Sequence, residues 1–151
     1  MDKTLYVGVT GRDMVRALMA PCLVLALLVS CAKSVNQAKF QSLYRSAKSL
    51  IAALDTGVTY GEFSTLVKSF ATEVSIGLDL ASTDSERACV YSYEWALKSY
   101  QDSLDLWYKE NRAAISSSQA DEAIQARWRL ARSYIKQAEQ YYSGARKLWG
   151  Q

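Results

Sequence analysis

The stretch IQARWRLARSYIKQAEQYYSGARKLW, residues 124–149, has the most regular apolar spacing in the chain. Its apolar and small residues recur at alternating steps of four and three: Ile124, Trp128, Ala131, Ile135, Ala138, Tyr142, Ala145 and Trp149. This spacing places side chains along one face of an α-helix. We therefore predict a helix from Gln119 to Trp149, with Asp121 and Glu122 in its first turn, where the helix dipole favours acidic groups.

Two shorter helices are predicted before it. The first covers roughly residues 35–55, and its apolar stripe is Phe40, Leu43, Ala47, Leu50 and Leu54. Gly57 follows and supplies a residue that can adopt a positive φ and end a helix. The second helix begins at Thr59 with capping-box spacing to Glu62. Its stripe is Phe63, Leu66, Phe70, Val74, Gly77 and Ala81.

A longer helix opens with the same spacing, between Thr83 and Glu86. It is expected to end between Lys109 and Ile115, and its stripe is Cys89, Tyr93, Ala96, Tyr100, Leu104 and Trp107. Cys89 is expected to be buried. Many of the tyrosines are expected at the edge of the core, because a phenol hydroxyl needs a polar partner.

The chain lacks alternating apolar runs and Asn-Gly or Asp-Gly turns, so the sequence predicts an all-α protein. Short links between the helices favour antiparallel neighbours. We expect one helical domain over residues 31–151, folded as an antiparallel four-helix bundle.

One segment suggests a different helical architecture. YEWALKSYQDSLDLWYKEN, residues 93–111, resembles the second helix of a tetratricopeptide repeat, which implies a short helical-hairpin repeat as the alternative fold. No second copy follows at the 34-residue period of that family. TGVTYGEFSTLV, residues 56–67, resembles a stretch of small, uncharacterised, all-helical bacterial envelope proteins and implies no activity.

A targeting segment is predicted at residues 1–30. Arg16 is followed by thirteen uncharged, mostly apolar residues at 17–29, which suits a signal-peptide core of about 7–15 residues. Leu28-Val29-Ser30-Cys31 resembles the lipobox of bacterial lipoproteins. The resemblance implies that the Cys31 sulfur receives a diacylglycerol carrying fatty acids such as palmitate, and that the leader is cut before Cys31.

Two further expectations concern this segment. Met14 starts a compact signal by itself, so we expect it to be the true initiator. The lipoprotein resemblance implies that Ala32, in place of Asp, favours the periplasmic face of the outer membrane where the host has one. The expected location is therefore the cell envelope, with the lipid on Cys31 as the membrane contact.

Composition excludes several functional classes. The 151 residues include no histidine, which removes the commonest general base, metal ligand and haem ligand. Neither a Gly-rich phosphate loop nor a Gly-x-Ser-x-Gly motif is present. We expect no enzymatic activity, no cofactor and no metal site. Residues 32–151 carry 15 basic and 13 acidic side chains, a net charge of +2, which does not favour nucleic acid.

Candidate binding residues lie on the last two predicted helices. Arg129, Arg132 and Lys136 are three and four positions apart and form either a basic binding patch or a solvated face. The aromatic residues of these helices either fill the core or bind a partner. Trp95 and Tyr108 leave the main stripe, so they are the candidates for exposed contacts.

The expected function is therefore binding or scaffolding. A lipid-anchored helical module would hold another cell-envelope protein through its last two helices, at an effective concentration raised by the membrane. The alternative is a bundle that binds a small hydrophobic ligand or lipid in a cavity between those helices. The oligomeric state is left open.

Overall fold

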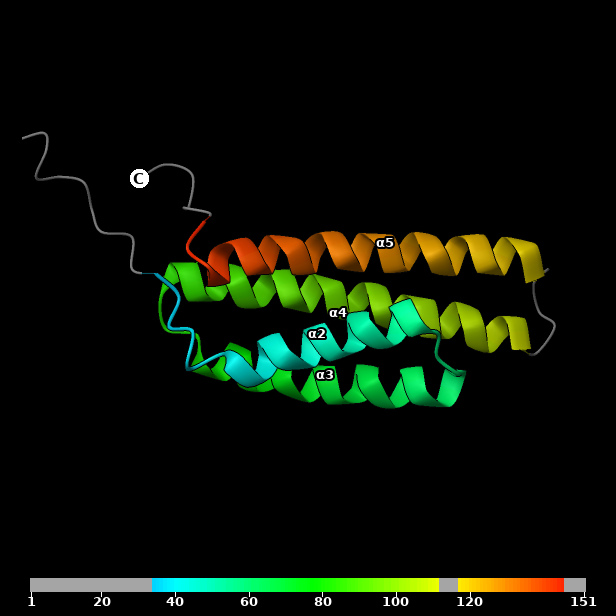
Figure 1. Ribbon diagram of the computed structural model, residues 1–151, viewed down its shortest axis with the longest axis horizontal. Helices are drawn as coiled ribbons and strands as arrows, with labels where there is room; N and C mark the ends of the chain where they lie inside the picture. The colour runs from blue at the N-terminus through cyan, green and yellow to red at the C-terminus, as the bar shows by residue number, and fades with distance from the viewer. Residues whose placement is uncertain (1–33, 112–116, 146–151) are drawn as a thin grey trace, which may run out of the picture. The chain divides into compact units, whose positions relative to one another are not determined.

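The computed structural model describes residues 34–111 and 117–145. Within these ranges the chain forms four helices and no strand: α2 (Gln41–Thr56), α3 (Tyr60–Leu80), α4 (Asp84–Asn111) and α5 (Ser117–Tyr142). Successive helices are antiparallel neighbours (Figure 1). The predicted all-α, antiparallel four-helix bundle is therefore confirmed.

Both predicted capping boxes are present. The Thr59 hydroxyl accepts the Glu62 amide, and the Glu62 carboxylate accepts the Thr59 amide at 2.9 Å. At the start of α4 the Thr83 hydroxyl accepts the Glu86 amide at 3.2 Å, and Glu86 accepts the Thr83 amide at 3.3 Å. Each box satisfies amides that the first helical turn leaves without a partner, which explains why α3 and α4 begin where they do.

The core lies where the apolar stripes meet. All five predicted stripe residues of the first helix region are buried, and so are most of those on the other three helices. Aromatic rings interlock across the interior. Phe63 meets Tyr100 edge-to-face at a centroid distance of 5.9 Å, and Phe70 meets Tyr93 at 6.1 Å. These rings fill the space between α3 and α4.

Helices α4 and α5 pack closely because small residues face the seam between them. On α4 these are the buried Ser92, Ala96, Ser99 and Ser103, and on α5 they are Ala120, Ala131 and Ala138. The serine hydroxyls donate to carbonyls three or four residues earlier on α4, so their burial leaves no donor unpaired. Two long helices can therefore approach along most of their length (Figure 1).

Cys89 lies at this seam. Its side chain is fully buried, as predicted, and its thiol donates to the Ala138 carbonyl oxygen at 3.4 Å. Burial, and to a smaller degree the negative charge of Glu86, raises the pKa of the thiol to about 12. Cys89 is therefore a packing residue that joins α4 to α5.

The ring of helices is closed between α2 and α5 by side chains. The Tyr44 and Tyr142 rings stack at 4.8 Å, and Lys48 bonds Glu139 at 3.0 Å. Gln37 donates to the Tyr142 carbonyl oxygen, and the Tyr142 hydroxyl donates back to the Gln37 carbonyl, both at 3.0 Å. We call this set of contacts the α2–α5 seam.

Two expectations about the bounds of the helices need correction. The first helix begins at Gln41 and not near Val35, because the preceding residues form turns closed by bonds of the i→i+3 type. The last helix ends at Tyr142 and not at Trp149, because Gly144 has a φ of 73°. Trp149 itself lies outside the described residues.

The tyrosines divide between the edge of the core and its centre. Tyr44, Tyr60, Tyr134 and Tyr142 are partly exposed, as expected for the edge of the core. Tyr93 and Tyr100, in contrast, are completely buried. Among the described residues neither hydroxyl has a hydrogen-bond partner. The edge-to-face contacts with Phe70 and Phe63 explain this position, because ring burial outweighs the loss of the hydroxyl's partner.

Candidate functional site

The outer sides of α4 and α5 carry an exposed aromatic surface. Trp95 is 53% exposed, and its ring lies 6.3 Å from that of Tyr134 on α5. Tyr91 lies one turn before Trp95, and Leu130 one turn before Tyr134; both are exposed. We refer to Tyr91, Trp95, Leu130 and Tyr134 as the aromatic surface.

Helical spacing explains why Trp95 points outward. The buried residues of α4 nearest to it are Tyr93 and Ala96, which face the interior and the neighbouring helices. Trp95 lies more than a quarter turn around the helix from both residues. Lys98 Nζ lies 5.4 Å from the centroid of the Trp95 ring. The lysine covers part of the indole face and leaves the rest accessible.

A shallow hollow lies beside Trp95. It has a volume of about 370 Å³ and is lined by Glu94, Trp95, Leu97, Lys98 and Gln101, all from α4. An acidic, a basic and an amide side chain thus border one exposed indole. This mixture of charge and aromatic area is suited to another protein surface more than to a purely apolar molecule.

Tyr108 does not belong to the aromatic surface. It is 46% exposed, but it follows Trp95 by 13 residues, which corresponds to about 20 Å along a helix. A step of 13 residues also turns its side chain away from the direction of Trp95. Both residues are exposed as the sequence indicated, and the structure does not bring them together.

The basic residues of α5 are divided among different neighbours. Arg132 donates to the Asp55 carboxylate of α2, so its charge is balanced across the α2–α5 seam. Arg127 lies 3.9 Å from Asp102 of α4. Within the described part of the chain, Arg129 and Lys136 are exposed and form no ion pair. The predicted patch therefore leaves two free cations.

Other hollows of the described structure lie on its surface. One of about 560 Å³ surrounds the turn between α2 and α3 and is lined by Ala53, Thr56, Gly57, Val58, Gly61, Glu62, Thr65 and Leu66. A smaller one of about 270 Å³ lies between α2 and α3 near Lys39 and Leu80. Neither lies between α4 and α5, where the ligand-binding alternative would place its cavity.

Residues 34–111 and 117–145 contain no group of three or more Cys, Asp and Glu side chains that could hold a metal ion. The same residues include no helix that is both long enough and apolar enough to cross a membrane. Cys31 and the predicted leader lie outside the described residues.

Sequence reasoning named Trp95 and Tyr108 as exposed but missed Tyr91 and Leu130. The signal for both was available, because each lies one helical turn from an aromatic residue off the main stripe. No protein-family model, curated protein or solved structure matches the chain.

Proposed function

We propose that this protein is a lipid-anchored helical module that holds another component of the cell envelope on the aromatic surface of α4 and α5. The observation that carries the proposal is the contact of the exposed Trp95 with the half-buried Tyr134, extended along both helices by the exposed Tyr91 and Leu130. Tryptophan and tyrosine are enriched among the residues that supply most of the binding energy at protein interfaces.

The filled interior favours a surface function over a ligand cavity. Phe63, Phe70, Tyr93 and Tyr100 are all fully buried and pack against one another between α3 and α4. The close approach of α4 and α5 through serine and alanine leaves little space at the seam that the alternative requires. A partner bound outside this seam needs no rearrangement of the core.

The anchor is supported by the sequence Leu28-Val29-Ser30-Cys31. Two or more fatty-acid chains hold a protein on a bilayer stably, whereas one chain gives only marginal binding. Cys31 precedes the buried Val35 by four residues, which span at most roughly 14 Å. A lipid on Cys31 would therefore keep the bundle close to the membrane surface, at the periplasmic face of the outer membrane where the host has one.

The proposed partner presents an amphipathic helix and is anchored in the same envelope. Its apolar side would cover Trp95 and Tyr134, and its polar side would meet the charges of Glu94 and Lys98. Confinement in the same thin layer raises the effective concentration of both proteins, so a moderate affinity suffices.

Two experiments test this proposal on the full-length chain in a bacterial host. Cys31→Ser should abolish fatty-acid labelling and leave a larger, unprocessed precursor; normal processing would contradict the anchor. A photo-crosslinking amino acid in place of Trp95 should form an adduct with an envelope protein that mass spectrometry identifies. The same amino acid at Lys136, which lies about 200° around α5 from Tyr134, is the matched control and should give no such adduct.

A further inference from the structure

The outward side of α4 carries charges in an unusual order. Its exposed residues include Arg87, Glu94, Lys98 and Asp105, with Tyr91 and Trp95 among them. Steps of seven, four and seven residues return to nearly the same side of an α-helix. The four charges therefore form one row, which we call the α4 row, with the signs plus, minus, plus and minus.

This row is self-complementary when it is reversed. Arg87 and Asp105 each lie nine positions from residue 96, and Glu94 and Lys98 each lie two positions from it. In both pairs the two members have opposite charge. A copy of α4 turned end to end about residue 96 would therefore place each of these four charges opposite a charge of the other sign, while Lys109, exposed four residues after Asp105, would meet the uncharged Thr83.

The charges are available for such a contact. Among the described residues Glu94, Lys98 and Asp105 form no ion pair, and Lys98 only covers the Trp95 ring. Arg87 bonds Asp84 within its own helix, but both side chains are largely exposed and free to shift. The apolar area of Trp95 lies level with the middle of the row, about 80° around the helix from Arg87.

From this arrangement we infer that the partner of the aromatic surface is a second copy of this chain, packed antiparallel along α4. The two-fold axis passes near residue 96, so Glu94 faces the partner's Lys98 and Arg87 faces the partner's Asp105. Trp95 of each copy lies at the mid-length of the contact, on its flank towards α5, and supplies apolar area there. This inference rests on the proposed function, since it names the occupant of the same surface.

The expected pair is weak in dilute solution. One helix from each copy buries less area than the roughly 1,200–2,000 Å² of a stable interface. Confinement at a membrane surface compensates, because it replaces a three-dimensional search by a high local concentration. The charges then select the antiparallel register more than they add affinity.

The test is carried out in cells that express full-length chains with two different tags, each with the photo-crosslinking amino acid at position 95. Adducts that contain both tags report pairing. With Glu94→Lys in both copies, or Lys98→Glu in both, residues 94 and 98 carry the same charge in each of the two symmetric contacts. The repulsion should reduce these adducts on the order of 10-fold or more. Co-expression of one Glu94→Lys copy with one Lys98→Glu copy should restore them. Arg129→Glu, on the far side of α5, is the control and should change nothing.

The other outcomes are decisive as well. Two-tag adducts that do not respond to the charge changes would overturn the antiparallel register. Adducts with an unrelated envelope protein alone would overturn the second copy as occupant and leave the proposed function standing. The absence of any adduct from position 95 would overturn the inference together with the proposed binding surface. Both variants lie on exposed positions, and an unchanged circular dichroism spectrum of each verifies its fold.

Discussion

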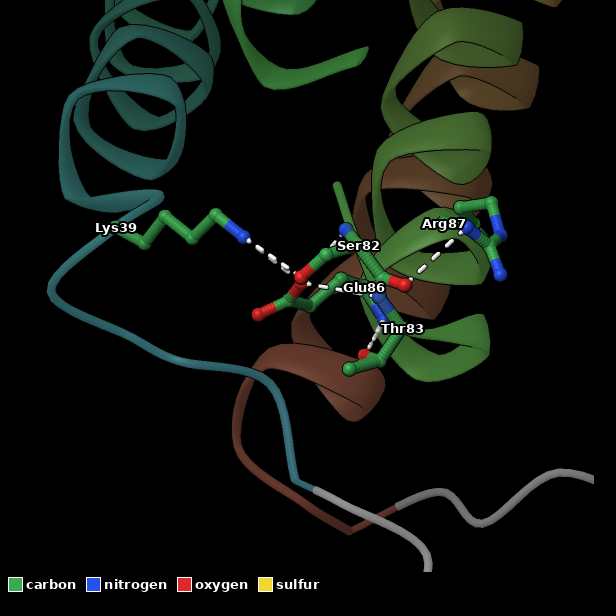
Figure 2. Close-up of polar contacts among 5 residues, drawn as sticks. All are labelled: Lys39, Ser82, Thr83, Glu86 and Arg87. Atoms are coloured by element: carbon green, nitrogen blue, oxygen red, sulfur yellow. Dashed lines mark hydrogen bonds and ion pairs between the residues drawn. The ribbon is translucent and has the colours of Figure 1, made fainter. Parts of the chain in front are cut away.

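The Lys39 ammonium lies 3.0 Å from the Glu86 carboxylate and joins the chain that enters α2 to the first turn of α4 (Figure 2). The same carboxylate oxygen accepts the amide and the hydroxyl of Ser82, both at 2.9 Å. Burial alone raises the pKa of Glu86, but hydrogen bonds from Ser82, Lys39 and Thr83 outweigh it and hold the pKa at about 2. One buried carboxylate thus caps a helix and fastens it to a second segment.

This arrangement predicts a dependence of stability on pH. A carboxylate whose pKa is lower in the folded than in the unfolded state stabilises the fold above its unfolded pKa, about 4.5, and loses this contribution as the pH falls towards 2. The loss should amount to about 3 kcal/mol, since one pKa unit corresponds to about 1.4 kcal/mol. Glu86→Gln should lower the free energy of unfolding at pH 7 and flatten its decrease between pH 4.5 and 2.

Chemical denaturation of both proteins across this pH range is the measurement. Glu62→Gln is the matched control, because Glu62 occupies the equivalent capping position of α3 but is exposed and receives no lysine. An equal effect of the two substitutions would contradict a special role for the Lys39 contact.

Gly77 lies on α3 at a position where alanine should lower stability, although alanine has a higher helix propensity than glycine. A Cβ added there would lie 2.9 Å from Leu43 Cδ2 and 3.3 Å from Val90 Cγ1, both in the buried core. Gly77→Ala should therefore destabilise the protein by about 1 kcal/mol, because overpacking exceeds the gain in propensity.

Gly61 provides the comparison within the same helix. A Cβ at this position meets no atom within 4 Å, so Gly61→Ala should stabilise the fold by up to about 1 kcal/mol. Thermal unfolding of the two variants distinguishes the cases. Stabilisation by both substitutions would show that α2, α3 and α4 are less tightly packed than the contacts of Gly77 indicate.

Removal of the hydroxyl of a buried tyrosine, Tyr93 or Tyr100, should not destabilise the fold. Tyr93→Phe and Tyr100→Phe each remove a buried hydroxyl that has no partner among the described residues. Each should leave stability unchanged or raise it by up to about 1 kcal/mol. Tyr142→Phe removes a hydroxyl that donates to the Gln37 carbonyl, and should cost about 0.5–1 kcal/mol. Urea unfolding at pH 7 compares the three; a large loss for Tyr93→Phe would be inconsistent with an unpaired hydroxyl.

Cys89 should resist alkylation in the native protein. Its thiol is buried, and the pKa of about 12 leaves almost no reactive thiolate at pH 8. Peptide mapping after iodoacetamide treatment should show Cys89 unmodified in the folded chain and modified in urea. Rapid native labelling would mean that the α4–α5 seam opens readily.

Much of the fold could be predicted because local signals agreed with one another. The two capping boxes and the three-four spacing of residues such as Leu43, Phe70 and Ile135 all favour helices with one buried face. The end of α5 was missed because apolar spacing continues to Trp149 and outweighed the stop signal of Gly144, which has a positive φ. Periodicity shows which residues can share a face, but not where the helix stops.

The candidate site was harder to predict, since exposure depends on what the neighbouring helix covers. Spacing places Arg129, Arg132 and Lys136 near one another, but Asp55 of α2 engages only Arg132. Likewise, the spacing of Tyr91 to Trp95 places both residues off the main stripe, but the fraction of each side chain that stays exposed depends on the packing of the neighbouring helices. The pairing of distant helices decides both cases.

The order of the contacts in the α2–α5 seam determines which of them a force on the N-terminal side of the chain would break first. Gln37 is the first residue after the start of the described chain to bond α5, and it does so through two reciprocal hydrogen bonds with Tyr142. A force applied to the chain ahead of Ser34 acts first on these two hydrogen bonds. It acts on the Lys48–Glu139 and Arg132–Asp55 contacts later, because they lie further along α2. The helix nearest the pull would therefore peel from α5 one contact at a time, while the tightly packed α4–α5 pair stays intact.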